Sequence, residues 1–261
     1  MRRFALLIIL GISACSRGSR SSDGPSPDRG RITSSSALIS RMHDRYSGRW
    51  YSTLRFEQSN TFFMQSGREE KSRWVEHLSV PGRLRIDFMP LSTRSGLLIL
   101  NNRVTTFDNG RRVDTRRAIQ PLLTLTADVY AIPAAVTLRR IDSLGVDLDK
   151  FHEARWQRKR VYVIGARKGD LTADQFWVDA DRLVLLRMIQ RERRGTRTIV
   201  TDTRVGDYRE IEGFPIAFEY VSLRDGKPFF KEVYEKVRVN VPIASAMFDP
   251  ARWSSARPSS P

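Results

Sequence analysis

The stretch that most constrains the fold is residues 161–189, with the sequence VYVIGARKGDLTADQFWVDADRLVLLRMI. Three runs rich in β-branched, aromatic or aliphatic residues, at 161–164, 175–178 and 183–189, are separated by turn residues. Short apolar runs with turns between them predict three consecutive antiparallel strands. Such a meander must bury its apolar face, and the chain supplies more strands and one helical insert to do so. We therefore expect a curved sheet with an apolar inner wall.

Other parts of the chain repeat the strand pattern. Leu84, Ile86 and Phe88 alternate with charged residues, as expected of a strand with one buried face. Tight turns are predicted at Asn101-Asn102 and at Asp225-Gly226. Beyond the central meander, strands are expected at residues 49–58, 61–65, 71–79, 83–89, 97–100, 104–107, 196–205, 215–223 and 229–239.

Two regions have helical spacing instead. Residues 37–46 form an amphipathic pattern preceded by Ser36 as an N-cap, and residues 117–148 suggest two short helices with Pro133 near a start. Helices inserted between strands would form a lid or plug. The expected fold is mainly β, of the α+β type: a curved antiparallel half-barrel of about ten strands with an N-terminal helix and a two-helix lid.

The beginning of the chain has the features of an export signal. Arg2 and Arg3 precede an apolar run at residues 4–12, which is too short to span a bilayer. Ile12-Ser13-Ala14-Cys15 resembles a bacterial lipobox, whose cysteine becomes the acylated first residue; the alternative is an ordinary signal peptide with a chance cysteine. Ser16 in place of Asp favours the outer membrane. We expect a signal peptide at 1–14, lipidated Cys15 and a disordered Ser/Gly/Pro-rich tether at 15–36, a half-barrel domain at 37–253 and a disordered tail at 254–261.

The net charge of +16 favours contact with anionic surfaces. A solvated surface of mixed charge and a contact with anionic lipid both fit the arginine-rich sequence, and nucleic acid is not expected as a partner. We expect a monomer.

Residues suited to catalysis or metal binding are not grouped. His43, His77 and His152 lie far apart and have no ligand partners at metal-site spacing. Asp179 and Asp181 flank a predicted turn, where Asp side chains usually bind backbone amides. No nucleophile elbow, phosphate loop or dinucleotide motif occurs. The sequence therefore predicts no catalytic residue, no metal and no cofactor, and a protein that is not an enzyme.

The aromatic and aliphatic strand residues allow two interpretations. They could pack together as a core, or they could line a cavity wide enough for acyl chains, and periodicity does not separate these. The candidate cavity-wall residues are Trp50, Leu54, Phe56, Trp74, Leu84, Ile86, Phe88, Phe176 and Trp177. The candidate lid residues are Ile119, Leu122, Leu123, Val136, Leu138 and Ile141.

Four stretches carry a family resemblance. They are VPGRLRIDF at 80–88, LLILNNRVTTFD at 97–108, QFWVDADRLVLLRM at 175–188 and VPIASAMFDP at 241–250. With the order of helix, strands, two-helix insert and strands, residues 37–253 resemble the LolA/LolB superfamily of bacterial lipoprotein carriers and receptors. The resemblance implies an open half-barrel covered by helices, a cavity for lipoprotein acyl chains and no enzymatic activity.

One position departs from the family pattern. Carriers of this family often have an arginine immediately before the proline of the first stretch, where it acts as a latch to the lid. Val80 occupies that position here, and Arg83 and Arg85 are the candidate replacements as lid or headgroup contacts. The lipid anchor is similar to the receptor branch.

Two hypotheses follow. The first is an outer-membrane lipoprotein, anchored in the lipid by acylated Cys15 and facing the periplasm of a diderm bacterium, that binds lipoprotein or lipid cargo in its half-barrel. The second is an envelope scaffold that binds a periplasmic protein or a cell-wall component, with the cavity filled by its own side chains.

Overall fold

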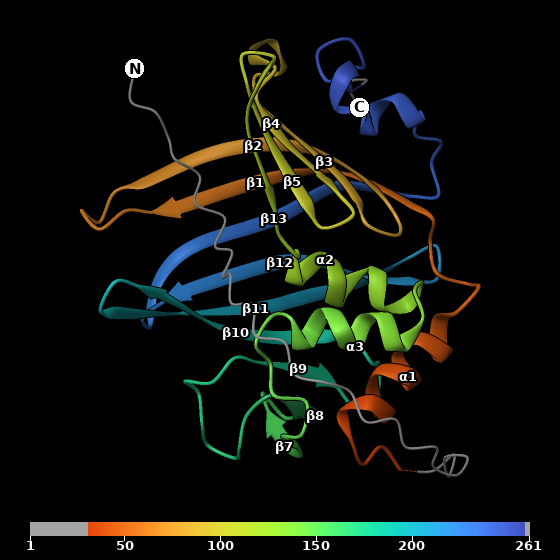
Figure 1. Ribbon diagram of the computed structural model, residues 1–261, viewed down its shortest axis with the longest axis vertical. Helices are drawn as coiled ribbons and strands as arrows, with labels where there is room; N and C mark the ends of the chain where they lie inside the picture. The colour runs from red at the N-terminus through yellow and green to blue at the C-terminus, as the bar shows by residue number, and fades with distance from the viewer. Residues whose placement is uncertain (1–30, 259–261) are drawn as a thin grey trace.

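The computed structural model describes residues 31–258, which form one large antiparallel sheet with helices on one of its faces (Figure 1). The strands are β1 (Thr53–Phe63), β2 (Glu69–Ser79), β3 (Arg83–Phe88), β4 (Gly96–Leu100), β5 (Arg103–Asp108), β6 (Arg111–Arg117), β7 (Phe151–Trp156), β8 (Lys159–Ile164), β9 (Gln175–Asp179), β10 (Leu185–Arg194), β11 (Arg197–Ile211), β12 (Phe214–Arg224) and β13 (Lys227–Val239). The helices are α1 (Ser35–Tyr46), α2 (Pro121–Thr126) and α3 (Ala134–Asp142), with short 3-10 turns η1 (Leu91–Thr93), η2 (Asp128–Tyr130), η3 (Ser245–Phe248) and η4 (Pro250–Arg252).

The sheet is open. Its strand order is β6-β5-β4-β3-β2-β1-β13-β12-β11-β10-β9-β8-β7, so β6 and β7 are its two edges. These edge strands are neighbours in the chain, and the segment between them contains α2, η2 and α3. This lid segment, residues 118–150, is therefore attached at both ends to opposite edges of the sheet.

Several hairpins have the turn residues that the twist of paired strands requires. Asn101 and Asn102 have φ of 45° and 64°, and Asp225 and Gly226 have φ of 49° and 77°. Positive φ at both central positions is the type I′ pattern that Asn and Gly favour. Both predicted tight turns are confirmed.

The prediction of a curved antiparallel half-barrel with helices is confirmed, but the sheet has 13 strands rather than about ten. Residues 49–58 and 61–65, expected as two strands, contribute to the single strand β1. The edge strands β6 and β7 were not predicted. Nearly all of β6 is exposed and no residue of β7 is buried, so neither shows the apolar alternation that marks a strand with one buried face.

Residues at and next to both ends of the expected domain, 37–253, take part in its packing. Helix α1 begins at Ser35, and Ser34 caps it by accepting a hydrogen bond from Ala37 N at 3.1 Å. Ile32 is also buried. At the other end, Trp253 stacks on Phe107 with ring centroids 4.2 Å apart. The expected signal peptide and Cys15 lie outside the described residues.

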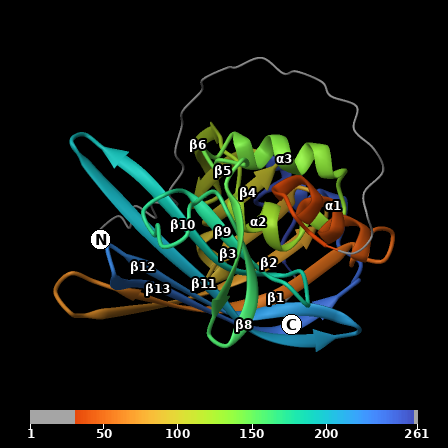
Figure 2. The same cartoon turned by 90° about the horizontal axis from the view of Figure 1, so that it is seen from below.

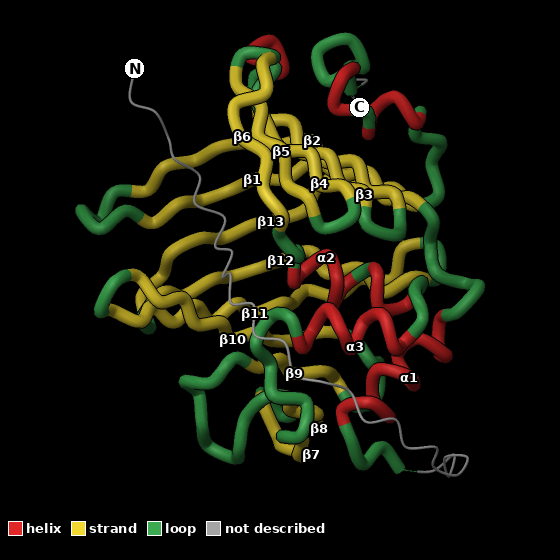
Figure 3. Tube along the Cα trace, viewed as in Figure 1, coloured by secondary structure: helices red, strands yellow, loops and turns green. Residues whose placement is uncertain are grey.

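The two faces of the sheet have separate cores. We call the face that carries α1, α2 and α3 the inner face, and the opposite face the outer face; the helices gather over one end of the inner face (Figures 2 and 3). Two large clusters lie between the sheet and the helices. Two smaller clusters lie on the outer face, one of them built from β4, β5 and the C-terminal segment.

Candidate functional site

Most of the predicted wall residues lie together on the inner face. Leu54, Phe56, Trp74 and Ile86 are buried in one cluster, with Trp50, Leu84 and Phe88 packed against it. Phe176 belongs to the neighbouring inner cluster, which also contains residues of α1. The period-2 alternation of β1 and β3 places these side chains on one face.

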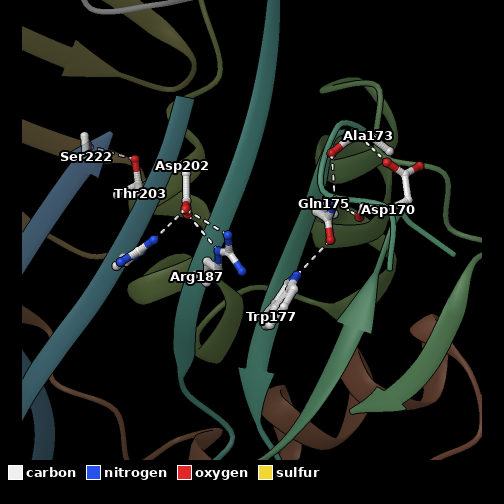
Figure 4. Close-up of polar contacts among 9 residues, drawn as sticks. Asp170, Ala173, Gln175, Trp177, Arg187, Asp202, Thr203 and Ser222 are labelled. Carbon is white, nitrogen blue, oxygen red and sulfur yellow. Dashed lines mark hydrogen bonds and ion pairs between the residues drawn. The ribbon is translucent and has the colours of Figure 1, made fainter. Parts of the chain in front are cut away.

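Trp177 is the exception, because it lies on the outer face with Val161, Val163 and Leu186. Its Nε1 donates to Gln175 Oε1 at 2.8 Å, and the Arg187 guanidinium lies 4.6 Å from the Trp177 ring centroid (Figure 4). Strand β9 is buried on both faces, so its apolar run does not reveal which residues point inward. Successive residues of a strand must point to opposite faces, and Phe176 and Trp177 therefore cannot share a wall.

Arg85 does not contact the lid. It forms a two-bond ion pair with Asp87, at 2.8 Å for both contacts, and donates to the carbonyl oxygens of Met247 and Trp253 at 3.3 and 3.0 Å. Arg83 also lies on the outer face, where its guanidinium is 5.6 Å from the Phe248 ring. Odd positions of β3 point outward, and these arginines contact the C-terminal segment there.

The lid is packed closely on the sheet. Leu123 and Ile141 are buried, Leu122 and Leu138 pack against the inner clusters, and Ile119 and Val136 are half-buried outside them. A cavity bounded by α2, α3, β9 and β10 has a volume of about 10 Å³. That volume holds about one water molecule. An acyl chain can enter this region only if the lid moves.

A buried carboxylate joins the lid to the sheet. Asp128, in η2, is 1% exposed; it accepts hydrogen bonds from Gly82 N at 2.9 Å and from Arg140 Nη1, on α3, at 2.6 Å. Burial raises the pKa of Asp128, while the bonds from Gly82 and Arg140 oppose that shift. The sequence predicted a contact between sheet and lid at Arg83 and Arg85 of the sheet. Asp128 of the lid makes this contact instead. No sequence motif around Asp128 indicated this role.

The rest of the inner face has no helix over it, as the view from below shows (Figure 2). Aromatic side chains from neighbouring strands meet there: Phe62 and Phe230 have ring centroids 4.6 Å apart, and Trp74 and Phe88 have centroids 5.1 Å apart. An open groove of about 650 Å³ lies at the same end of β1 and β2, lined by Ser59, Asn60, Thr61, Lys71, Ser72, Arg73, Met89 and Pro90. Ser59, Thr61, Lys71 and Arg73 alternate with the inner-face residues, so their side chains belong to the outer face. Phe62, Phe88 and Phe230 are half-buried, so this part of the inner face can contact an apolar ligand without lid movement.

Polar side chains interrupt the aromatic wall. Asn60 on β1 lies opposite Glu232 on β13 and Ser72 on β2, and Glu76 lies four residues further along β2. Desolvation raises the pKa of Glu232 to about 8, and burial together with the nearby Glu232 charge raises the pKa of Glu76. The sequence did not single out this group, because its members come from strands far apart in the chain.

The structure brings no metal site together within residues 31–258. His77 is buried, and desolvation lowers its pKa to about 4, which keeps the ring neutral. Asp179 Oδ1 accepts from Asp181 N and Arg182 N, both at 2.9 Å, as the turn interpretation predicts. No helix among the described residues has the length and apolar character needed to span a membrane.

The three-dimensional structure of this chain is similar to structures of known proteins. No family model and no curated protein matches the chain. Among solved structures, a DUF1329 family protein from Desulfovibrio piger is 14% identical, with a TM-score of 0.57 over 84% of this chain and 98% of that one. A putative outer membrane lipoprotein-sorting protein domain from Vibrio parahaemolyticus is 11% identical, with a TM-score of 0.55 over 82% and 96%. A LolA superfamily protein from Nitrosomonas europaea is 11% identical, with a TM-score of 0.52 over 84% and 98%.

The chain has a LolA-like fold. The resemblance inferred from the sequence is confirmed at the level of the fold. The lid segment lies on the inner face of this sheet, and Asp128 links the two through Gly82 and Arg140, whereas the candidates Arg83 and Arg85 lie on the outer face.

Proposed function

We propose that this protein binds acyl chains of lipoproteins or other amphiphiles on the inner face of its half-barrel and takes part in their transfer or localisation. The observation that carries the proposal is the half-covered inner face, where the aromatic side chains of Phe62, Phe88 and Phe230 are half-buried while the lid covers the rest. Burial of apolar surface would drive binding, at roughly 25 cal/mol per Å². The protein acts as a binding protein, without catalysis.

The second part of the proposal concerns location. We propose that Cys15 is acylated and anchors the protein in the outer membrane, with the half-barrel in the periplasm. The sequence Ile12-Ser13-Ala14-Cys15 supports it, and attachment of more than one acyl chain gives stable anchoring. Mass spectrometry of the N-terminal peptide of the mature protein tests it: an unmodified Cys15 would refute the anchor.

Ligand binding is tested with two variants of neighbouring residues. Phe230 lies in the inner cluster and Lys231 pairs with Glu219 on the outer surface, so Phe230→Glu and Lys231→Glu place the same side chain on opposite faces. We expect native mass spectrometry to detect co-purified or added lipopeptide on the wild type and on Lys231→Glu, and at least tenfold less on Phe230→Glu. A wild type that binds neither lipopeptide nor fatty acid contradicts the proposal.

The scaffold hypothesis has one observation in its favour. The space under the lid is filled by side chains, and the edge strand β6 presents the exposed Arg111, Arg112 and Val113 to solvent. An acidic periplasmic protein or cell-wall component could pair with this edge. Crosslinking from position 113 in cells separates the two hypotheses. The scaffold hypothesis predicts a protein adduct at β6, whereas a carrier without a partner at β6 gives no protein adduct there.

A further inference from the structure

The uncovered part of the inner face leads to Arg224 near the end of β12. Tyr220 belongs to an inner cluster, and Ser222, two residues later, lies opposite Phe230 of the aromatic wall. Arg224 is the next residue on the same face, because alternate residues of a strand point the same way. Each strand residue rises by about 3.3 Å, which places Arg224 about 7 Å beyond the row that contains Phe230. The aromatic wall is therefore followed directly by a positive charge.

Two further arginines lie beside it on the neighbouring hairpin. Arg194 at the end of β10 lies opposite Arg197 at the start of β11. Both continue the faces of strands that place Met188 and Val205 in an inner cluster. Figure 2 shows the β10–β11 and β12–β13 hairpins projecting away from the helices. Burial lowers the pKa of Arg224, and the nearby charge of Arg194 lowers it further, so these side chains form one basic cluster.

The carboxylates near this cluster are bonded to other groups. Glu192 accepts two hydrogen bonds from Arg194, at 2.8 and 3.0 Å. Asp225 accepts from Arg197 Nη2 at 2.5 Å and from a backbone amide of β11 at 2.9 Å. Arg224 makes no ion pair among the described residues, although both carboxylates are near enough to oppose the fall in its pKa.

The Arg224 guanidinium also lacks hydrogen bonds. Its Nε and Nη2 atoms are buried and have no partner within residues 31–258. The guanidinium lies 3.5 Å from the Phe229 ring centroid, a cation–π contact with one of its faces. Its N–H donors lie in the guanidinium plane, so stacking leaves them unpaired. A buried charge without hydrogen bonds is costly, and the cluster therefore favours a ligand that supplies an anion.

An anion can reach this cluster from solvent. Arg224 as a whole is half-buried, and the side chains of Arg194 and Arg197 are 35% and 70% exposed. Rotation of the long Arg224 side chain presents its buried nitrogens to a ligand, without any movement of the lid.

We propose that Arg224, Arg194 and Arg197 bind the anionic headgroup of an amphiphile whose chain lies on Phe230 and Phe62. A phosphate or carboxylate group accepts two N–H bonds from one guanidinium, and this geometry fits the unpaired Arg224. The inference rests on the proposed binding of acyl chains and adds the chemical class of the ligand, an amphiphile with a negative headgroup.

The test compares probes that share a decyl chain and differ in headgroup. Decyl phosphate is anionic, decanol is neutral, and inorganic phosphate has no chain. Each is titrated into the protein after lipid has been removed, and binding is followed by calorimetry and native mass spectrometry. We expect the wild type to bind decyl phosphate about tenfold more tightly than decanol, because charge-assisted bonds to arginine are added. Inorganic phosphate should bind about tenfold more weakly than decyl phosphate, because it lacks the apolar contact.

Three variants locate the effect. Arg224→Gln should reduce the preference for decyl phosphate to within about twofold and leave decanol binding unchanged, which also reports an intact wall. Arg224→Lys keeps the charge without the two-bond geometry and should retain only part of the preference. Arg193→Gln is the matched control, because Arg193 is exposed, adjoins Arg194 and lies on the outer face. It should keep the full preference.

Each failure has a separate meaning. Equal binding of decyl phosphate and decanol by the wild type overturns the subsite and leaves the proposed function standing. An equal loss in Arg193→Gln and Arg224→Gln also overturns it, since general charge attraction then explains the preference. Inorganic phosphate that binds as tightly as decyl phosphate overturns the assignment to an amphiphile. Binding of neither decyl phosphate nor decanol overturns both proposals.

Discussion

At the scale of single residues, two groups on opposite faces of the sheet respond to pH in opposite directions. The pKa of Glu232 is raised from 4.5 to about 8 by desolvation, so the folded state keeps a proton that the unfolded chain has lost. Its contribution to stability is complete below pH 4.5 and falls as pH rises toward 8. His77, whose pKa is lowered from 6.5 to about 4, makes the folded state more stable as pH rises through that range.

Between pH 6.5 and 8, the change in stability with pH therefore reports the carboxyl groups with raised pKa values and not His77. We expect the unfolding free energy of the wild type to fall across this range, and Glu232→Gln to have a shallower slope and a higher stability at pH 8. Glu76, whose pKa is also raised, accounts for the decrease in unfolding free energy with pH that remains in Glu232→Gln. Urea denaturation at pH 6.5, 7.25 and 8 measures this, with the outer-surface variant Glu219→Gln as the control. An unchanged slope in Glu232→Gln would contradict the assigned pKa.

Gly96 permits close packing between β3, β4 and the C-terminal segment. A Cβ atom at this position would lie 2.0 Å from Ile86 O and 3.0 Å from the Trp253 ring. Gly96→Ala should lower the unfolding free energy by about 1–3 kcal/mol, the usual cost of overpacking. Gly206→Ala is the control, because a Cβ atom there meets nothing within 4 Å. Thermal unfolding compares the two, and equal melting temperatures would show that the backbone at Ile86 and the Trp253 ring both shift without cost.

At the scale of elements, the lid depends on one charged contact with the sheet. Asp128 binds the Gly82 amide on the β2–β3 turn and the Arg140 guanidinium on α3. Tyr130 OH adds a hydrogen bond to Leu183 O at 2.9 Å, and apolar residues such as Leu123 and Ile141 supply much of the remaining contact. Separation of the lid from the sheet removes this bond from the buried Gly82 amide, which adds to the cost of opening.

Removing this contact should loosen the lid selectively. Asp128→Ala leaves the Gly82 amide unpaired, and we expect a loss of about 2–3 kcal/mol in unfolding free energy, as for hydrogen bonds to a charged group. Hydrogen exchange of residues 121–142 should accelerate more than that of β12 and β13. Asp147→Ala, which removes an exposed pair with Lys150, serves as the control. Uniform acceleration across the sheet would show that Asp128 stabilises the whole fold and not the lid in particular.

At the scale of the whole molecule, the sequence predicted the architecture better than the site. The alternation of Leu84, Ile86 and Phe88 was sufficient to place an inner wall, because one face of β3 is apolar. Alternation carries no such information in β9, buried on both faces, or in β6, exposed almost throughout. Asn60 and Glu232 were not predicted as neighbours, since their contact depends on the pairing of β1 with β13.

The strand order also determines how the sheet can assemble. Every ladder except β1–β13 joins strands that are consecutive in the chain. Residues 53–117 and 151–239 can therefore each form by local hairpin closure, and the pairing of β1 with β13 is the single step of high sequence separation. Non-local pairing is slow because loop entropy is lost before contacts form. A circular permutant that joins the present ends and opens the chain within residues 143–150 would turn the sheet into a continuous meander, and it should refold faster than the natural order.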